Sequence, residues 1–233
     1  MTSHPGLSER SSFMSLPPSH RGSGQLYAAA PPHSGLAGRL QQWREAQLAR
    51  QCLDAAGEPG LVLDLPCGSG RFWPVLAEHA NRVILAADHD PDQLSLAMSG
   101  SPAALSARVA PLKASAEAIS LGNNAVDCIF CMRWFHHVPS SAQRLSVLRE
   151  FHRVSRDTVI ISLWVDGNFR AWRRRRLEQR RLDAGQGSDR HNRFVVPRAQ
   201  IEAEFRQAGF AIVDHHDLVP GYAMWRTYVL RKA

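Results

Sequence analysis

The chain has 233 residues, of which 44% are hydrophobic and 21% are charged, as expected of one globular domain with appendages. Its longest apolar runs hold five residues, among them 83–87 and 128–132, so the composition excludes collagen-like, wholly disordered and membrane-spanning chains. The net charge of +7 is concentrated between Arg170 and Arg181, where seven arginines accompany one acid. This distribution argues against a protein that binds nucleic acid through positive charge over its whole surface.

The N-terminal segment predicts a disordered tail over residues 1–25, because it is rich in Ser, Pro and Gly. It lacks the apolar stretch of roughly 7–15 residues that a secretory signal needs, which favours a cytoplasmic protein. The domain itself is expected over 26–233. Its first helix is predicted from the spacing of Leu36, Leu40 and Trp43, which places the three side chains on one helical face.

Two β-α units are predicted next. The apolar run 61–65 is a short buried strand, and it leads through a glycine-rich turn into a helix over 71–80. The run 83–87 is a second buried strand, after which Asp90 can cap a helix and Pro91 suits its first turn.

The rest of the chain continues the alternation. Further strands are predicted near 109–112, 126–132, 158–164, 210–219 and 225–230. Helices are predicted after Ser140 or Ser141 and between Pro197 and Gly209. The pattern predicts an α/β fold: a seven-stranded, mostly parallel sheet with helices on both faces, an antiparallel last strand, and an insert or lid over about 165–196.

The glycine-rich turn after the first strand is the expected ligand site, because open parallel sheets bind ligands at the carboxyl ends of their strands. A dinucleotide fingerprint would have a third glycine where Trp73 stands, and a P-loop would have Lys before Ser or Thr where Arg71 stands. Both cofactor types are disfavoured. Two acids remain, Asp64 before the turn and Asp88 at the end of the second strand, and a carboxylate at the latter position suits ribose hydroxyls.

Four segments in register resemble class I S-adenosylmethionine-dependent methyltransferases, closest to the type 11 group that includes quinone-biosynthesis enzymes. They are 61–70 with the glycine turn, 84–94 with Asp88, 113–117, and 126–138. The resemblance covers roughly residues 36–165 and implies a Rossmann-like fold with S-adenosyl-L-methionine as cofactor.

Carried over by position, the resemblance implies a set of cofactor-binding residues. The turn would hold the methionine part through Asp64, Pro66, Cys67, Gly68 and Gly70. Asp88 would bind the ribose, and His89, Ser115, Ala116, Cys131 and Met132 would surround the adenine. The sequence departs from the family at Pro66, where glycine is usual, and at Ser115, where aspartate is common. Pro66 fixes φ and removes one N–H from the turn, and at Ser115 one adenine contact is expected to be weaker or to use a hydroxyl instead.

Candidates for catalysis and metal binding are few. His136 follows the fourth strand and can act as a general base, although His136 and His137 can equally pack the strand end. No metal site is expected, because Cys128 and Cys131 lie three residues apart in a strand and should face opposite ways. Asp127 at the start of that strand is expected to be structural.

The insert carries a helix in which Phe169 and Trp172 accompany the arginines of 170–181. Guanidinium groups match phosphates and carboxylates, so the methyl acceptor can be anionic. We expect a small or lipid-like acceptor that is methylated on an O, N or C atom. The same helix can make peripheral contact with a membrane. Two alternatives stay open: an RNA methyltransferase that uses the helix as a phosphate grip, and a non-catalytic S-adenosylmethionine-binding protein. A dehydrogenase is disfavoured by Trp73.

Overall fold

The computed structural model describes residues 35–184 and 193–233, so the tail predicted over 1–25 lies outside the described residues. The helices of the described residues are α1 (Leu36–Ala55), α2 (Trp73–Leu76), α3 (Pro91–Gly100), α4 (Ala103–Ser106), the 3-10 turn η2 (Phe135–His137), α5 (Ser141–Val154), α6 (Phe169–Asp183) and α7 (Arg198–Gln207). The strands are β1 (Leu61–Asp64), β2 (Val83–Asp88), β3 (Val109–Lys113), β4 (Val126–Cys131), β5 (Ser155–Val165), β6 (Val195–Val196), β7 (Phe210–Asp217) and β8 (Trp225–Lys232).

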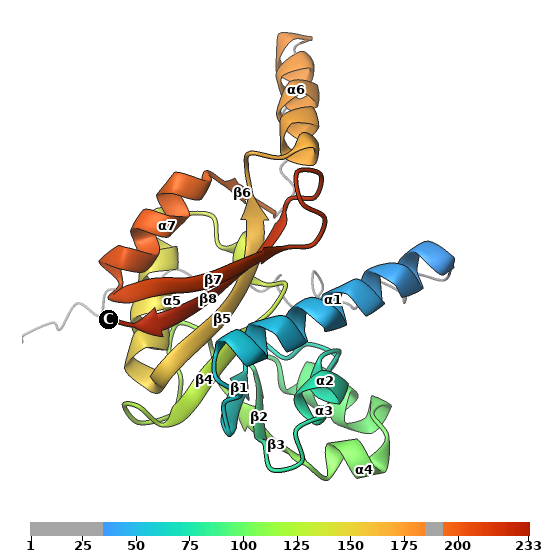
Figure 1. Ribbon diagram of the computed structural model, residues 1–233, viewed down its shortest axis with the longest axis vertical. Coiled ribbons are helices and arrows are strands. Elements are labelled where there is room, and N and C mark those ends of the chain that lie inside the picture. The colour runs from blue at the N-terminus through green and yellow to red at the C-terminus, as the bar shows by residue number, and fades with distance from the viewer. Residues whose placement is uncertain (1–34, 185–192) are drawn as a thin grey trace, which may run out of the picture.

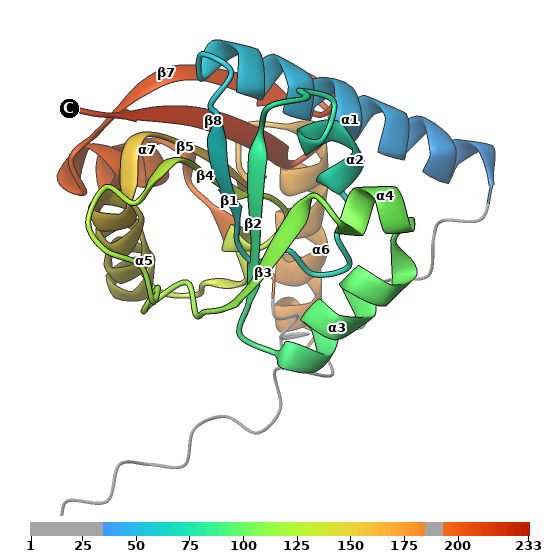
Figure 2. The same ribbon diagram turned by 90° about the horizontal axis from the view of Figure 1, so that it is seen from below.

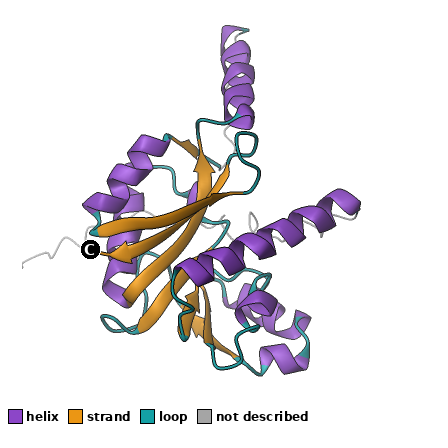
Figure 3. Ribbon diagram, viewed as in Figure 1, coloured by secondary structure: helices purple, strands orange, loops and turns teal. Residues whose placement is uncertain are grey.

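The strands form one sheet in the order β3-β2-β1-β4-β5-β8-β7. The first five of these pair in parallel, whereas β8 is antiparallel to both β5 and β7. Figure 3 shows helices around this central sheet. The predicted α/β architecture with an antiparallel last strand is confirmed.

Two hydrophobic layers sandwich the sheet, with α1 to α4 on one face and α5 and α7 on the other (Figure 2). Strand β4 contributes to both layers, because its side chains alternate: Cys128 and Phe130 pack in the α1 layer, and Ile129 and Cys131 in the α5 layer. The prediction that Cys128 and Cys131 face opposite ways is therefore confirmed. All four cysteines of the chain are buried and free.

Helix ends are largely set by the residues that the sequence singled out. The Asp90 carboxylate accepts the Asp92 N–H at 2.9 Å at the start of α3, and the Ser140 hydroxyl accepts the Gln143 N–H at 3.2 Å at the start of α5. Gly209 follows α7 with a φ of 88°, a left-handed conformation that favours glycine.

Two predictions of secondary structure need correction. The helix expected over 71–80 is the single turn α2, because arginine side chains rather than further helical N–H groups satisfy the carbonyls that follow it: Arg82 donates to the Leu76 carbonyl and Arg108 to those of Ala77, His79 and Ala80. The count of seven strands is also one short. The eighth, β6, has two residues paired with the end of β5, too few to give a recognisable alternation.

The predicted insert contains α6 and β6, with residues 185–192 outside the description. Figure 1 shows α6 rising from the carboxyl end of β5 and pointing away from the sheet. The N-terminal half of α1 also extends beyond the sheet, which leaves Leu36, Leu40 and Trp43 exposed on their common face. In the two described ranges, no helix combines the length and apolar character that crossing a membrane requires.

Candidate functional site

The turn that follows β1 is held by main-chain hydrogen bonds. The Cys67 N–H donates to the carbonyl of Ala87 in β2 at 2.9 Å, and the Gly70 N–H donates to the carbonyl of Cys67 at 3.0 Å. Pro66, half-buried, enters the turn through a cis peptide bond with Leu65. These contacts fix the turn against the end of the neighbouring strand.

The two glycines of the turn have different reasons to be glycine. Gly70 has a φ of 69°, and a Cβ there would lie 2.7 Å from the Trp73 ring, so both conformation and packing exclude a side chain. Gly68 has a φ of 52°, but a Cβ there would meet no atom within 4 Å. The main chain at Gly68 is therefore open to close approach by a ligand.

Asp88, buried at the end of β2, joins the turn to the second strand. One carboxylate oxygen accepts the Gly68 N–H at 3.2 Å. The other accepts the Asp90 N–H at 3.1 Å and lies 3.0 Å from Nδ1 of the exposed His89 ring. A carboxylate offers about four acceptor positions, so one remains, and the movement of His89 would release a second.

Asp64 lies at the end of β1 beneath the turn. Its carboxyl group accepts the indole N–H of Trp73 at 3.1 Å. Burial raises the pKa of Asp64 to about 8, and the nearby Asp88 carboxylate acts in the same direction, while the Trp73 hydrogen bond opposes them. Asp64 is therefore largely protonated near neutral pH.

The remaining cofactor candidates lie on the two strands that flank β1 and β2. The main chain after β3 is tied to Asp88, whose carbonyl accepts the Ala114 N–H at 3.1 Å. Ser115 beyond it is exposed and accepts the Glu117 N–H, and Ala116 is buried. Cys131 and Met132 are buried at the end of β4, the neighbour of β1 on its other side.

These residues fit a ligand that carries a nucleoside and no pyrophosphate. A carboxylate with a spare acceptor position stands beside an open glycine main chain, and no basic side chain of the described residues hydrogen-bonds to Gly68. Within residues 35–184 and 193–233, no three His, Cys, Asp or Glu side chains are arranged to hold a metal ion.

His136 lies in η2, just after β4, and is only 3% exposed. Its ring is stacked on Trp164 at 4.9 Å between centroids and meets the edge of Trp225 at 4.7 Å. Burial and, to a smaller extent, the neighbouring His137, Arg193, Arg133 and Arg174 together lower the pKa of His136 to about 2. The imidazole is therefore neutral at physiological pH, and its role as a base stays a prediction.

Three arginines gather around this aromatic group. Arg174 of α6 and Arg193 lie over the Trp164 ring at 5.3 and 5.8 Å from its centroid, and Arg133 lies over Trp225 at 5.3 Å. The sequence analysis did not single out Trp164, Trp225 or Arg133, since none belongs to a recognisable motif. The position of Trp164 at the end of a buried strand was the one available signal.

The two halves of the site are linked by Glu45, a buried residue of α1. Its carboxylate lies 2.7 Å from Arg71, next to the glycine turn, and 2.6 Å from Arg133, at the end of β4. The main-chain N–H of Arg133, which has a φ of 62°, donates to the hydroxyl of Ser162 at 2.6 Å.

Asp127 is structural as predicted, because it accepts the N–H of Leu61 at 2.9 Å and ties β4 to β1.

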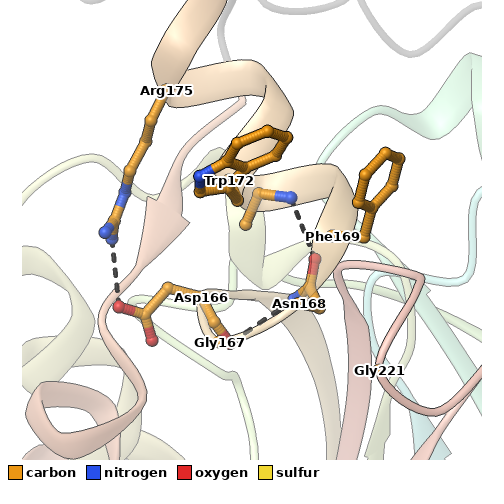
Figure 4. Close-up of a pocket in the computed structure, with 8 residues that line it drawn as sticks. Asp166, Gly167, Asn168, Phe169, Trp172, Arg175 and Gly221 are labelled. Atoms are coloured by element: carbon orange, nitrogen blue, oxygen red, sulfur yellow. Dashed lines mark hydrogen bonds and ion pairs between the residues drawn. The ribbon is translucent and has the colours of Figure 1, made fainter.

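A groove of about 500 Å³ lies at the base of α6 (Figure 4). Arg175 reaches from α6 to Asp166, at 3.0 Å, while Phe169 and Trp172 line the groove from the same helix. Asn168 caps the helix by accepting the N–H of Ala171 at 2.9 Å and donating to the carbonyl of Val165. The groove marks where α6 joins the carboxyl end of β5.

Comparisons with known proteins agree with this fold. Residues 62–158 match the protein family described as a methyltransferase domain. A search of curated proteins gives no significant match. Among solved structures, magnesium protoporphyrin IX methyltransferase from Synechocystis PCC 6803, with bound SAH, is similar with a TM-score of 0.67 and 15% identity, over 85% of this chain and 88% of that chain.

Two further solved structures with this fold are named for different reactions. A putative O-methyltransferase from Nostoc punctiforme PCC 73102 is similar with a TM-score of 0.60 and 22% identity, over 81% of this chain and 56% of that one. The [4+2]-cyclase SpnF is similar with a TM-score of 0.59 and 17% identity, over 80% of this chain and 81% of that one. At such identities the likeness shows the fold. Residues 62–158 therefore form a methyltransferase domain, and the fold around them is the one shared with these S-adenosylmethionine-dependent methyltransferases.

Proposed function

We propose that this methyltransferase binds S-adenosyl-L-methionine at the turn between β1 and α2 and transfers its methyl group to an O, N or C atom of a small or lipid-like anionic acceptor. The observation that carries the cofactor site is the hydrogen bond of 3.2 Å between the Gly68 N–H and the Asp88 carboxylate. It brings the two motif positions that the family resemblance assigns to the methionine and ribose parts into direct contact.

Each cofactor residue has a defined task in this proposal. Asp88 accepts the ribose hydroxyls at its remaining positions, with His89 moving aside toward the adenine. Gly68 and Gly70 let the main chain approach the methionine part, and Pro66 and Cys67 hold the turn. Ser115, Ala116, Cys131 and Met132 border the adenine. When bound, the cofactor supplies a methyl group on a sulfonium, an electrophile that needs a well-placed nucleophile more than it needs a strong base.

The acceptor would lie beside η2, where His136 offers a neutral imidazole. An acceptor hydroxyl could donate to the ring, but a base with a pKa near 2 removes protons poorly in the free enzyme. Positioning is therefore the contribution we assign to His136, with proton removal depending on a change of its environment when the acceptor binds.

Helix α6 also supports peripheral contact with an anionic membrane. Phe169, Trp172 and Leu177 are exposed, and Arg170, Arg173, Arg176 and Arg180 have no carboxylate within ion-pair distance in the part of the chain described. Exposed aromatic side chains among arginines suit the headgroup region of a bilayer. A lipid-like acceptor would then be reached from the surface on which the helix lies.

The cofactor site is tested by calorimetric titration of S-adenosylmethionine and S-adenosylhomocysteine. Asp88→Ala should weaken both by at least about 100-fold, since two hydrogen bonds to a charged group are lost. Asp92→Ala, an exposed acid four residues further on, is the matched control and should bind like the wild type. Circular dichroism would verify that Asp88→Ala remains folded.

The outcome also separates the alternatives. Binding without turnover of any screened anionic lipid, small acceptor or RNA would favour a non-catalytic cofactor-binding protein. Methylation of RNA in preference to small acceptors would favour the RNA methyltransferase. No binding of either ligand by the wild type would contradict the proposed function.

A further inference from the structure

We propose that Arg174 and Arg193 form a recognition site for an anionic group, a carboxylate or a phosphate, on a planar methyl acceptor that contacts Trp164. This inference rests on the proposed function, because it names the acceptor class of the same enzyme. Among the arginines of α6, the inference assigns Arg174 to the acceptor site and the others to roles outside it.

The site is assembled from four parts of the chain at the carboxyl end of the sheet. His136 comes from η2, Trp164 from the end of β5, and Trp225 from the start of β8, opposite Trp164 in the antiparallel pair. The insert contributes residues from its first half and from its last residues, which contact each other: Arg174 donates to the carbonyl of Arg193 at 3.0 Å. The N–H of Phe194 donates to the carbonyl of His136 at 2.7 Å.

Two buried polar atoms in this group have no hydrogen-bond partner among residues 35–184 and 193–233. They are Nδ1 of His136, which is 3% exposed, and Nε1 of Trp164, which is 9% exposed. A buried polar atom without a partner costs about 1–3 kcal/mol, so two in one stacked pair indicate that a partner is to be supplied. The indole N–H can donate to an oxygen of a bound anion, and the neutral imidazole can bond to a hydroxyl group.

The charge around the pair is positive and only partly compensated. Arg133 is balanced by Glu45 at 2.6 Å. Arg174 and Arg193 have no carboxylate within ion-pair distance among the described residues, although both lie within 6 Å of the Trp164 ring centroid. Two guanidinium groups without an acid, beside an unpaired N–H, form a site whose missing component is an anion.

The aromatic side chains restrict the rest of the ligand. Trp164 and Trp225 lie 5.7 Å apart at 80°, and His136 contacts both. A ligand that reaches the indole N–H of Trp164 would therefore meet aromatic rings, which favour a planar apolar body over a polar, flexible one. Arg175, the neighbour of Arg174, forms an ion pair with Asp166. Arg173 is exposed and has no carboxylate within ion-pair distance in the described part of the chain. Arg174 alone among the α6 arginines contacts the Trp164 ring in the described structure.

The test uses three probes of similar shape, titrated calorimetrically into the full-length protein saturated with S-adenosylhomocysteine. They are 4-hydroxybenzoate with a carboxylate, phenyl phosphate with a phosphate, and the neutral 4-hydroxybenzamide. At least one anionic probe should bind the wild type tenfold or more tightly than the neutral probe, and which anion binds better identifies the group that the acceptor carries.

The variants are Arg174→Gln, Arg193→Gln and the matched control Arg173→Gln. The first two should lose about 10-fold or more in affinity for the preferred anion and leave the neutral probe unchanged, whereas Arg173→Gln should stay within about twofold of the wild type for all probes. Equal binding of neutral and anionic probes, no binding of any probe, or equal losses in Arg173→Gln and Arg174→Gln would each overturn the inference.

The same titrations keep the two proposals apart. If S-adenosylhomocysteine fails to bind the wild type, the proposed function fails, and the preference for anions is then measured on the free protein. If S-adenosylhomocysteine binds but the anion preference is absent, only the inference about Arg174 and Arg193 fails.

Discussion

The two ends of the candidate site are built by different means. Around the glycine turn, main-chain groups and short acidic side chains satisfy one another: Gly68 bonds Asp88, and Trp73 bonds Asp64. Around η2, long side chains from distant parts of the chain meet on two tryptophans, with unpaired polar atoms at His136 and Trp164. At the first end both carboxylates have hydrogen-bond partners and Asp88 keeps a spare acceptor position. Among the described residues, the second end has buried polar atoms without a partner and positive charge without an acid.

This difference teaches where specificity resides. An end made from backbone geometry can be shared by many proteins of one fold, because it depends on a few residue types at fixed spacing. An end made from converging side chains is particular to one chain. The similarity to both methyltransferases and a cyclase agrees with this division, since the fold alone does not fix the reaction.

The largest expected effect would come from breaking the backbone-built end. Gly70→Ala places a Cβ 2.7 Å from the Trp73 ring at a φ of 69°. We expect a loss of about 2–5 kcal/mol in the free energy of unfolding, from backbone strain together with overpacking. Urea denaturation followed by circular dichroism measures this loss.

The control for Gly70 is Gly100→Ala, at the end of α3, where a Cβ would meet no atom within 4 Å. Its free energy of unfolding should stay within about 0.5 kcal/mol of the wild type. A Gly70→Ala variant as stable as Gly100→Ala would show that the turn is not fixed by packing against Trp73.

The next effect concerns the side-chain-built end and depends on pH. The pKa of His136 is about 2 in the folded protein, below the ordinary value of 6.5 expected for the unfolded chain. Between these pH values the unfolded chain binds a proton at this histidine and the folded chain does not. The stability of the folded protein is therefore unaffected by this group above pH 6.5 and decreases as the pH falls below it. The loss should reach about 2 kcal/mol at pH 5.

His136→Phe keeps an aromatic ring and removes the titrating group, so its stability relative to the wild type should rise as the pH falls from 7 to 5. The control His79→Phe replaces an exposed histidine and should show no such trend. Parallel acid dependence of the wild type and His136→Phe would mean that the imidazole is not held neutral by its surroundings.

The smallest expected effect concerns the arginines of α6 that do not contact Trp164, and it tests whether they act separately from Arg174. Arg180→Gln should weaken sedimentation with phosphatidylglycerol-containing vesicles by about fivefold, corresponding to about 1 kcal/mol for each basic group near an anionic surface. Arg206→Gln on α7 should have no effect. Equal weakening by both variants would indicate attraction by net charge alone, and salt-dependent binding to RNA instead of vesicles would favour the RNA methyltransferase.

Sequence patterns predicted the parallel sheet, most helices and the glycine turn, because each depends on local periodicity or on the backbone needs of glycine and proline. The same local rules overestimated α2, where Arg82 and Arg108 satisfy the carbonyls from a distance. They could not show that Trp164 and Trp225 meet, because these residues lie 61 positions apart and come together through the pairing of β5 with β8. Convergence of this kind depends on tertiary structure.

The alternation along β4 makes the two halves of the interior chemically distinguishable. Cys128 and Cys131 sit three residues apart on one strand, yet one is covered by the α1 layer and the other by the α5 layer, and burial raises the pKa of both thiols. A thiol reagent can reach either sulfur only after the covering helices separate from the sheet. The relative labelling rates of these neighbours therefore report which side of the molecule opens first, without any introduced probe.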